Sequence, residues 1–404
     1  MGNISPEEIA QELLGHCLAT GNWPAELLDR LISLALGDDS DAASKALFSI
    51  VVERLGDLFE PRLCEVYARL FSEVCERAIP GIKACELVER YHRVHAVRPF
   101  AGRDPANIVV LSRVTLGADV AVTSVVMDAL KLRFPSAVIW FAGNQKGWEL
   151  FQTDPRLRFL PTPYRRGGSL RDRLDVWTRL RESLAMENAI VVDPDSRLTQ
   201  LGLLPVCDDD RYYFFESRSY GSDSDAPLGL LASRWAGEVF GVEGAKAFIA
   251  PAQSDLNAEV TVSLGVGENP AKRVGGDFEA GMLRALAASG AKSILIDYGA
   301  GAEEAMRVEA ALQASGAQCR TWRGAYAPFA SAISRSRLYA GYDSSSQHVA
   351  AACGIPLVTV FAGYPSLRMF HRWRPHGTGP IHVIRVDHQS GDELLAEFKH
   401  ALPY

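Results

Sequence analysis

The sequence contains little of what marks membrane, secreted or nucleic-acid-binding proteins. No apolar run approaches the ~18 residues that suggest a membrane-spanning helix, and a net charge of −7 over 404 residues gives no general attraction for nucleic acid. The opening stretch MGNISPEEIAQELLGHC has acidic residues where a secretory signal has basic ones. We therefore expect a cytoplasmic protein with no nucleic-acid partner, in which peripheral contact with the inner face of a membrane is still allowed.

Cysteine is present, but not in patterns typical of metal sites or disulfide frameworks. The seven cysteines are odd in number and scattered, and none forms a C-x-x-C pair or a His/Cys metal spacing. We expect them to be reduced thiols, as in a reducing cytoplasm.

A composition of 48% hydrophobic and 23% charged residues is typical of a globular protein with two or three domains. Residues 1–96 predict helices only: Ser5 can cap the first helix, Pro6 fits its first position, and Glu8 completes a capping box. Apolar residues then recur at helical spacing. This pattern predicts a small all-α domain, and leaves open whether it mediates oligomerisation or binds a protein partner.

From about residue 106, short β-branched runs alternate with amphipathic helices, the pattern of parallel sheets covered on both faces. The expected strands span 107–112, 137–143, 157–161, 189–193 and 212–217 before a linker near 250–256, and 259–265, 292–299, 319–324, 337–343, 356–363 and 382–387 after it. The sequence thus predicts an α/β fold of two doubly wound Rossmann-like domains, 97–250 and 251–404, preceded by the all-α domain 1–96. Such sheets bind ligands at the carboxyl ends of their strands, so we expect the site in the cleft between the domains.

A polar turn after one predicted strand is a candidate phosphate site. In YDSSSQHVAAACGIP (342–356), the strand ends before Asp343, the serines form the turn, and an Ala-rich helix begins near His348 and ends at Gly354. Free backbone N–H groups at a helix start favour an anion, and small serines let it come close. Alternatively, Asp343 or Ser344 only caps the helix and His348 is a packed residue.

Two further segments place charged residues at the same cleft. Lys272, in VSLGVGENPAKRVGG (262–276), follows a glycine-bearing loop and can neutralise a diphosphate as a point charge. Asp119 follows the first strand of the earlier domain, where a carboxylate can take a proton from an attacking hydroxyl. The alternatives are a solvated surface lysine and an acid that offsets the helix dipole.

Two stretches resemble a known family. RVTLGADVAVTSVVMDALKLRFPSAVIWFAGN is similar to the opening of ADP-heptose:lipopolysaccharide heptosyltransferases, in which a Gly-Asp-Val turn precedes a helix that ends in a basic-Phe-Pro-x-Ala run. YDSSSQHVAAACGIPLVTVFAG is similar to that family's Asp-Ser-Gly-x-x-His-x-Ala-Ala-Ala-x-Gly-x-Pro motif. The resemblance runs in the same order over about residues 106–400.

The resemblance implies a GT-B fold in which the C-terminal domain holds a nucleotide-diphosphate sugar, with an ADP-sugar as the suspected donor, and a glycan or lipid-linked acceptor approaches from the N-terminal domain. Asp119 then matches the family's general base. The implied donor contacts are Lys272, Asp343, Ser344, Ser345, Ser346 and His348, with Glu303 near the nucleotide ribose. No metal or other cofactor is obligatory in this scheme. Ala118 stands where the family usually has Gly, and Ser345 replaces the motif glycine.

Other polar residues are candidates for the acceptor side. The arginine-rich stretch 163–181 suits an anionic acceptor or a membrane surface, although an exposed helix with internal ion pairs explains most of it, leaving Tyr164, Arg165 and Arg166. A second set follows the strand at 189–193: Asp193, Asp195, Ser196, Arg197 and Gln200.

The function predicted from sequence is an inverting glycosyltransferase that moves a sugar, such as a heptose, to a glycan or lipopolysaccharide-type acceptor. Ala118, Ser345 and the all-α domain motivate an alternative, a degenerate nucleotide-sugar-binding or scaffold protein. A nucleotide-sugar epimerase is a third possibility, but it needs more acid and base groups than the sequence offers.

Overall fold

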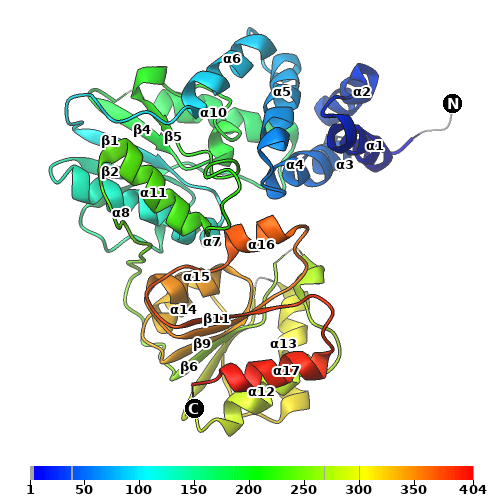
Figure 1. The fold of residues 1–404 in the computed structure, drawn as a ribbon, viewed down its shortest axis with the longest axis vertical. Coiled ribbons are helices and arrows are strands. Elements are labelled where there is room, and N and C mark those ends of the chain that lie inside the picture. The colour runs from blue at the N-terminus through cyan, green and yellow to red at the C-terminus, as the bar shows by residue number, and fades with distance from the viewer. Residues whose placement is uncertain (1–3, 38–39, 185, 268, 300, 404) are drawn as a thin grey trace.

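Two parallel sheets lie one above the other, and a group of helices extends from the upper sheet to one side (Figure 1). The computed structural model describes residues 4–37, 40–184, 186–267, 269–299 and 301–403. Among these residues, none of the helices combines the length and apolar composition that crossing a bilayer requires.

The N-terminal region is helical, as predicted. Ser5 and Glu8 form the expected capping box at the first helix. The elements are α1 (Pro6–Thr20), α2 (Ala25–Leu36), α3 (Ser40–Ala46), the π-helical η1 (Leu47–Val52), α4 (Glu53–Asp57), α5 (Pro61–Ala78) and α6 (Ala84–His95).

The first sheet has five parallel strands in the order β3-β2-β1-β4-β5. They are β1 (Asn107–Leu111), β2 (Val138–Gly143), β3 (Leu157–Pro161), β4 (Ala189–Asp193) and β5 (Tyr212–Phe214). Its helical segments are α7 (Leu116–Ala118), the π-helical η2 (Asp119–Thr123), α8 (Ser124–Arg133), α9 (Gln145–Trp148), α10 (Leu170–Ser183), η3 (Arg197–Thr199), η4 (Asp209–Arg211) and α11 (Leu228–Phe240). The strand order reverses between β1 and β4, so their carboxyl ends open a crevice for a ligand.

The second sheet has six parallel strands in the order β11-β10-β9-β6-β7-β8. They are β6 (Val260–Ser263), β7 (Ile294–Asp297), β8 (Arg320–Trp322), β9 (Leu338–Tyr342), β10 (Leu357–Phe361) and β11 (Ile381–Arg385). Its helices are η5 (Pro270–Lys272), α12 (Phe278–Ala288), α13 (Ala302–Ser315), α14 (Tyr326–Ile333), α15 (Ser345–Ala352), α16 (Leu367–Trp373) and α17 (Gly391–Ala401). All eleven predicted strands are confirmed, and the reversal of order here lies between β6 and β9.

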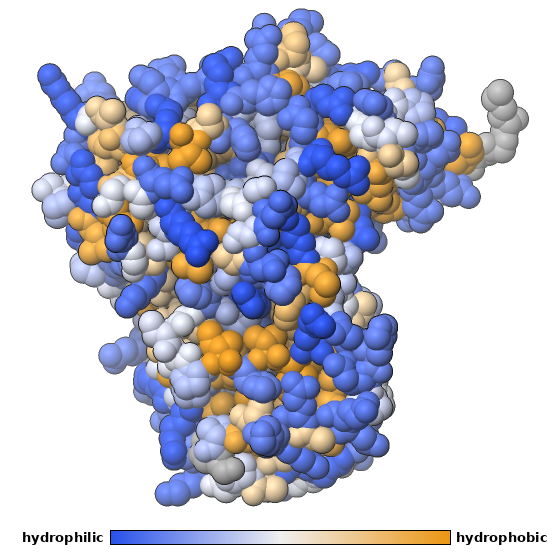
Figure 2. Space-filling model, viewed as in Figure 1, coloured by the Kyte–Doolittle hydropathy of each residue, from blue (hydrophilic) through white to orange (hydrophobic). Residues whose placement is uncertain are grey.

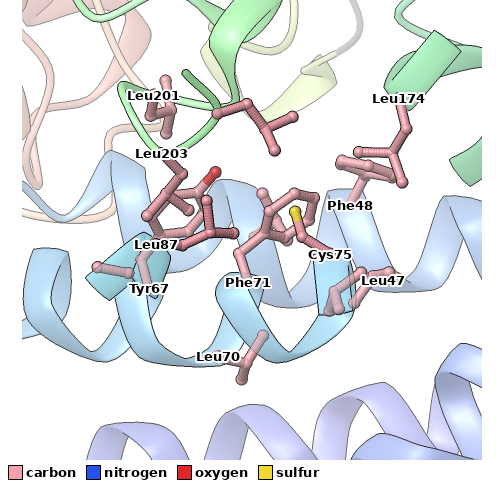
Figure 3. Packing of buried hydrophobic residues seen from close by; sticks show 14 of the residues in the cluster. Leu47, Phe48, Tyr67, Leu70, Phe71, Cys75, Leu87, Leu174, Leu201 and Leu203 are labelled. Atoms are coloured by element: carbon pink, nitrogen blue, oxygen red, sulfur yellow. The ribbon is translucent and has the colours of Figure 1, made fainter. Parts of the chain in front are cut away.

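The helical region shares one hydrophobic core with a face of the first sheet. Phe48 and Phe71 from the helices, Leu174 from α10 and Leu201 from the loop after η3 belong to one buried cluster, which also includes Val109 of β1. Figure 3 shows Phe48, Phe71, Leu174 and Leu201 in this cluster. The helices are therefore a covering layer of the first sheet. The division 1–96, 97–250 and 251–404 remains our proposal.

Helix α16 lies between β10 and β11 of the second sheet in sequence, but it and its C-cap residue are hydrogen-bonded to the first domain. Arg372 donates to the carbonyl oxygen of Ser222 at 3.1 Å, and Arg374 to that of Asp225 at 3.1 Å. On the face shown in Figure 2, hydrophilic side chains cover most of the surface and apolar ones gather in small patches.

Candidate functional site

An ion pair lies at the carboxyl ends of the central strands of the second sheet. The Lys272 Nζ is 2.5 Å from the Asp343 Oδ2, and the Gln347 side chain donates to the Asp343 Oδ1. Gly363, with φ of 65°, lets the end of β10 approach so closely that a Cβ would lie 2.5 Å from the Ala271 backbone. Because both charges are largely buried, Lys272 is not a solvated surface lysine.

The serine turn is folded against tyrosines of its own domain. Ser344 is the N-cap residue of α15 without a side-chain cap bond, and its hydroxyl lies 3.3 Å from that of Tyr339. Ser346 is buried, and its hydroxyl lies 3.1 Å from that of Tyr326. Ser345 is half-buried. The backbone N–H groups at the helix start are therefore the main groups here that can hold an anion.

Gly117 of α7 covers this turn from the first domain. A Cβ on Gly117 would lie 3.3 Å from the Ser345 Cα and 3.3 Å from the His348 Cδ2. His348 is buried, its ring centroid is 5.9 Å from that of Trp373, and burial lowers the pKa of its imidazole to about 4. In this structure His348 is a packed, neutral residue; its contact with a donor phosphate stays a prediction.

The acid predicted near the nucleotide ribose points into solvent. The Glu303 side chain is 75% exposed and pairs with Arg307 at 3.2 Å. Its neighbour Glu304 instead accepts hydrogen bonds from the backbone N–H groups of Val266 (2.8 Å) and Gly267 (3.0 Å), in the loop after β6. Adjacent helical residues point about 100° apart, so the carboxylate that supports this glycine-bearing loop is Glu304.

Asp119 is buried at the start of η2, and its hydrogen-bond donors belong to its own domain. They are the Ser112 Oγ at 2.6 Å, the Arg113 backbone N–H at 2.7 Å and the Thr123 Oγ1 at 2.9 Å. Burial raises the pKa of this carboxyl to about 6, although the three hydrogen bonds oppose the shift. Asp119 connects the end of β1 to the following helix and lines neither of the two cavities described next.

A cavity of about 1200 Å³ separates the helical region from the second domain. Its helical wall comes from α3, η1 and α4, which project beyond the lower sheet in Figure 1. Its wall on the second domain includes Val266, Gly267, Asn269, Lys272 and Gly363. Pockets for drug-sized ligands have about 300–1,000 Å³, so this space has room for a nucleotide sugar.

A second cavity, of about 220 Å³, lies at the carboxyl ends of the first sheet. Five arginines and three carboxylates line it, so its wall has a net positive charge. These residues are Arg113, Arg166, Arg173, Arg197, Arg218, Glu53, Asp57 and Asp195. Glu53, Asp57, Arg166 and Arg173 also line the larger cavity, so the two spaces adjoin.

Several of these guanidinium groups are incompletely paired. Among the described residues, the buried Arg113 Nε, Arg197 Nη1 and Arg218 Nη1 make no hydrogen bond. Asp195 forms ion pairs with two of these arginines, at 3.1 Å from Arg218 and 3.8 Å from Arg113. Buried guanidinium atoms without partners are costly, and an anion in the cavity would offset the positive charge of these groups.

The structure brings together only part of the predicted acceptor side. Asp195 and Arg197 line the smaller cavity, and Arg166 lines both while it pairs with Glu53 at 3.1 Å. Sequence reasoning missed Arg113 and Arg218, although each follows the end of a strand, β1 or β5, and that position is the available signal. Asp193, Ser196 and Gln200 are buried and line neither cavity. In the described ranges, no three His, Cys, Asp or Glu side chains gather as a metal site requires.

Two doubly wound domains that face each other across their carboxyl ends define a GT-B fold, as predicted. No family model and no curated protein sequence matches the chain. Among solved structures, the glycosyl transferase family 9 protein from Veillonella parvula matches with a TM-score of 0.54 and 14% identity over 73% of this chain and 98% of that chain.

The E. coli heptosyltransferase WaaC with ADP matches with a TM-score of 0.54 and 14% identity, over 73% of this chain and 100% of that one. The same enzyme with ADP-2-deoxy-2-fluoro heptose gives a TM-score of 0.50 at 14% identity, over 72% of this chain and 97% of that one. The fold predicted from the resemblance to heptosyltransferases is confirmed. Over a quarter of this chain has no counterpart in these structures.

Proposed function

We propose that this protein is an inverting glycosyltransferase that transfers a sugar from a nucleoside-diphosphate donor to an acceptor carrying a carboxylate or a phosphate. The observation that carries the proposal is the adjacency of the two cavities. One is bordered by Lys272 at the end of the second sheet, and the other is lined by five arginines at the end of the first.

The donor site is supported by Lys272 and the start of α15. The lysine supplies one cation, and the helix start supplies backbone N–H groups and the positive end of its dipole. Together they suit a diphosphate that gains negative charge as its bond to the sugar breaks. The solved structures with ADP and with an ADP-sugar analogue make ADP-heptose the first donor to test.

The acceptor site is supported by the incompletely paired guanidinium groups of Arg113, Arg197 and Arg218, which line the smaller cavity. Guanidinium groups bind carboxylate and phosphate oxygens in bidentate fashion. A cavity of about 220 Å³ has room for one carboxylate or phosphate group and a few neighbouring atoms of the acceptor. This size and charge favour a sugar acid or a phosphorylated sugar at the end of a glycan, including a lipid-linked glycan at a membrane surface.

The test is nucleotide release. The purified protein is incubated with ADP-heptose and, in parallel, with glycans that end in a sugar acid, a phosphorylated sugar or a neutral sugar. We expect ADP release, with product of inverted anomeric configuration, only with the anionic acceptors. Release at equal rates with neutral acceptors would contradict the assigned acceptor class, and no release with any pair would contradict glycosyl transfer.

A second candidate function is nucleotide-sugar binding without turnover. The observation in its favour is the burial of Asp119, whose carboxylate is surrounded by three donors of its own domain. Calorimetry separates the two candidates: tight binding of ADP-heptose without ADP release under any acceptor condition would support a binding protein.

A further inference from the structure

If the protein transfers a sugar, its acceptor hydroxyl needs a proton acceptor, and Asp119 is turned away from the cleft. Ala118, the residue before it, lines the arginine cavity, and Gly117 makes the close contact with Ser345. One residue further along a helix means a rotation of about 100°, which directs the Asp119 carboxylate into the domain interior.

The chain has a local reason for this rotation. The segment Asp119–Thr123 is π-helical, and such a turn accommodates one residue more than an α-helical turn. Gly117, rather than Ala118, makes the close contact with the serine turn. Ala118 thus lies between the glycine that contacts the serine turn and the buried aspartate.

Asp57 of the helical region presents a carboxylate at the place that Asp119 does not reach. It is the last residue of α4 and lines both the arginine cavity and the larger cavity that Lys272 borders. In the part of the chain that the structure describes, the Asp57 side chain makes no hydrogen bond and no ion pair closer than 4.0 Å. Part of its surface is accessible from the cavities, although neighbouring segments surround the carboxylate closely enough to desolvate it.

The backbone after Asp57 fixes this end of α4 between the two domains. Phe59 has φ of 57°, a left-handed conformation that costs energy in a residue with a side chain, and such strain clusters at functional sites. Its ring is buried, with its centroid 6.3 Å from that of Trp373, which in turn neighbours His348 at 5.9 Å. Ring contacts thus run from Phe59, two residues after Asp57, through Trp373 to His348 of α15.

The charged groups around Asp57 come from four segments. Glu53 lies on the same helix, Arg113 follows β1, Arg166 precedes α10, and Arg197 belongs to η3. Desolvation raises the pKa of the Asp57 carboxyl and Glu53 adds to the rise, whereas Arg197, Arg166 and Arg113 lower it. The net direction is upward, which favours proton uptake by this group.

We propose that Asp57, supplied by the helical region, is the general base of the transfer; this inference rests on the proposed function. Its carboxylate takes the proton of the acceptor hydroxyl as that oxygen bonds to the anomeric carbon. The bond between this carbon and the diphosphate oxygen breaks, and the nucleoside diphosphate leaves with the electron pair, facing Lys272. Asp57 ends protonated and returns the proton to solvent.

The experiment compares Asp57→Asn, Asp119→Asn and the control Asp29→Asn in the full chain. Asp29 is a surface residue of the helical region, paired with Arg77, and lines neither cavity. ADP affinity is measured by calorimetry, folding by thermal melting, and turnover by ADP release across pH 4–9, using the anionic acceptor that the wild type accepts.

We expect Asp57→Asn to lose about 10³-fold in kcat, with unchanged ADP affinity, and to lack the rise of activity with pH that ionisation of Asp57 gives the wild type. Asp119→Asn should lose less than about tenfold in turnover per folded molecule. A folded Asp57→Asn variant with more than a tenth of wild-type kcat overturns the inference, as does a folded Asp119→Asn variant without turnover. An inactive wild type refutes the proposed function itself, and this inference with it.

Discussion

The two sheets end in different kinds of cavity. At the first, five arginines and three carboxylates line about 220 Å³. At the second, Lys272 and glycine-bearing loops border about 1200 Å³, opposite charged residues of the helical region and of the segment 166–173. A small cavity with concentrated charge selects a ligand by its anionic group. The larger cavity spreads its charged residues over a wider wall, so it selects more by shape and by contacts with backbone groups. Substitutions at the cavity of one sheet should therefore weaken the binding of one substrate and leave the binding of the other unchanged.

The largest effect is expected on stability, at the first sheet. Burial raises the pKa of Asp119 to about 6, so between pH 4 and 6 the folded protein holds a proton that the unfolded chain has released. The stability from this proton is present below pH 4 and lost as pH rises to 6, a change of about 3 kcal/mol. Asp119→Asn cannot ionise, so its free energy of unfolding in urea should decline less over this range.

Asp193 and Asp297 also have a pKa raised to about 6, and they affect wild type and Asp119→Asn alike. The difference in unfolding free energy between the two proteins at each pH therefore reports on Asp119 alone. Parallel pH dependences would show that Asp119 does not titrate in this way.

The next effect concerns the second sheet. Lys272→Ala should weaken ADP binding about 100-fold, because it removes a charged contact to phosphate and leaves Asp343 unpaired beside it. Calorimetry measures the affinity, and Lys292→Ala, an exposed lysine of the same domain, is the matched control. Equal ADP affinity in both variants would remove Lys272 from the donor site.

A smaller effect is expected at the arginine cavity. Arg197→Ala removes a guanidinium whose Nη1 has no partner in the described structure, so the KM for the anionic acceptor should rise about 10-fold while ADP affinity stays the same. Arg179→Ala, on the exposed side of α10, serves as the control. If Arg197→Ala weakens ADP binding instead, the two cavities do not divide the substrates as described.

The smallest effect separates two adjacent acids. Glu304→Gln should weaken ADP binding about threefold, because the charged acceptor for the Val266 and Gly267 N–H groups is lost. Glu303→Gln should change it less, since that side chain points into solvent. The reverse order, measured in the same titration, would restore Glu303 as the ribose contact expected from sequence.

The strands were predictable because both faces of each sheet are covered, so strands such as Val109-Val110-Leu111 and Ile190-Val191-Val192 are continuous apolar runs bounded by polar turns. The position of the helical region could not be predicted from the sequence. Amphipathic spacing shows that Phe48 and Phe71 face a core, but it does not show that this core belongs to the first sheet.

Within the candidate site, residues that follow strands were predictable and their side-chain directions were not. Lys272 and Asp343 were singled out separately, and the structure joins them at 2.5 Å. Two other residues predicted from sequence were each displaced by one helical position. Ala118, not Asp119, lines the arginine cavity, and Glu304, not Glu303, binds the loop after β6. Asp57 had no signal in the sequence, because its place depends on how α4 packs against a distant part of the chain.

The contacts of helix α16 determine where hinges between the two domains can lie. Its arginines donate to carbonyl groups of Ser222 and Asp225 in the first domain, and Phe59 packs on its last residue, Trp373. A widening of the cleft that keeps these contacts must carry α16 with the first domain. The hinges then lie in the two segments that flank this helix and near residues 250–256, so three crossings of the chain, rather than one linker, set the axis of opening.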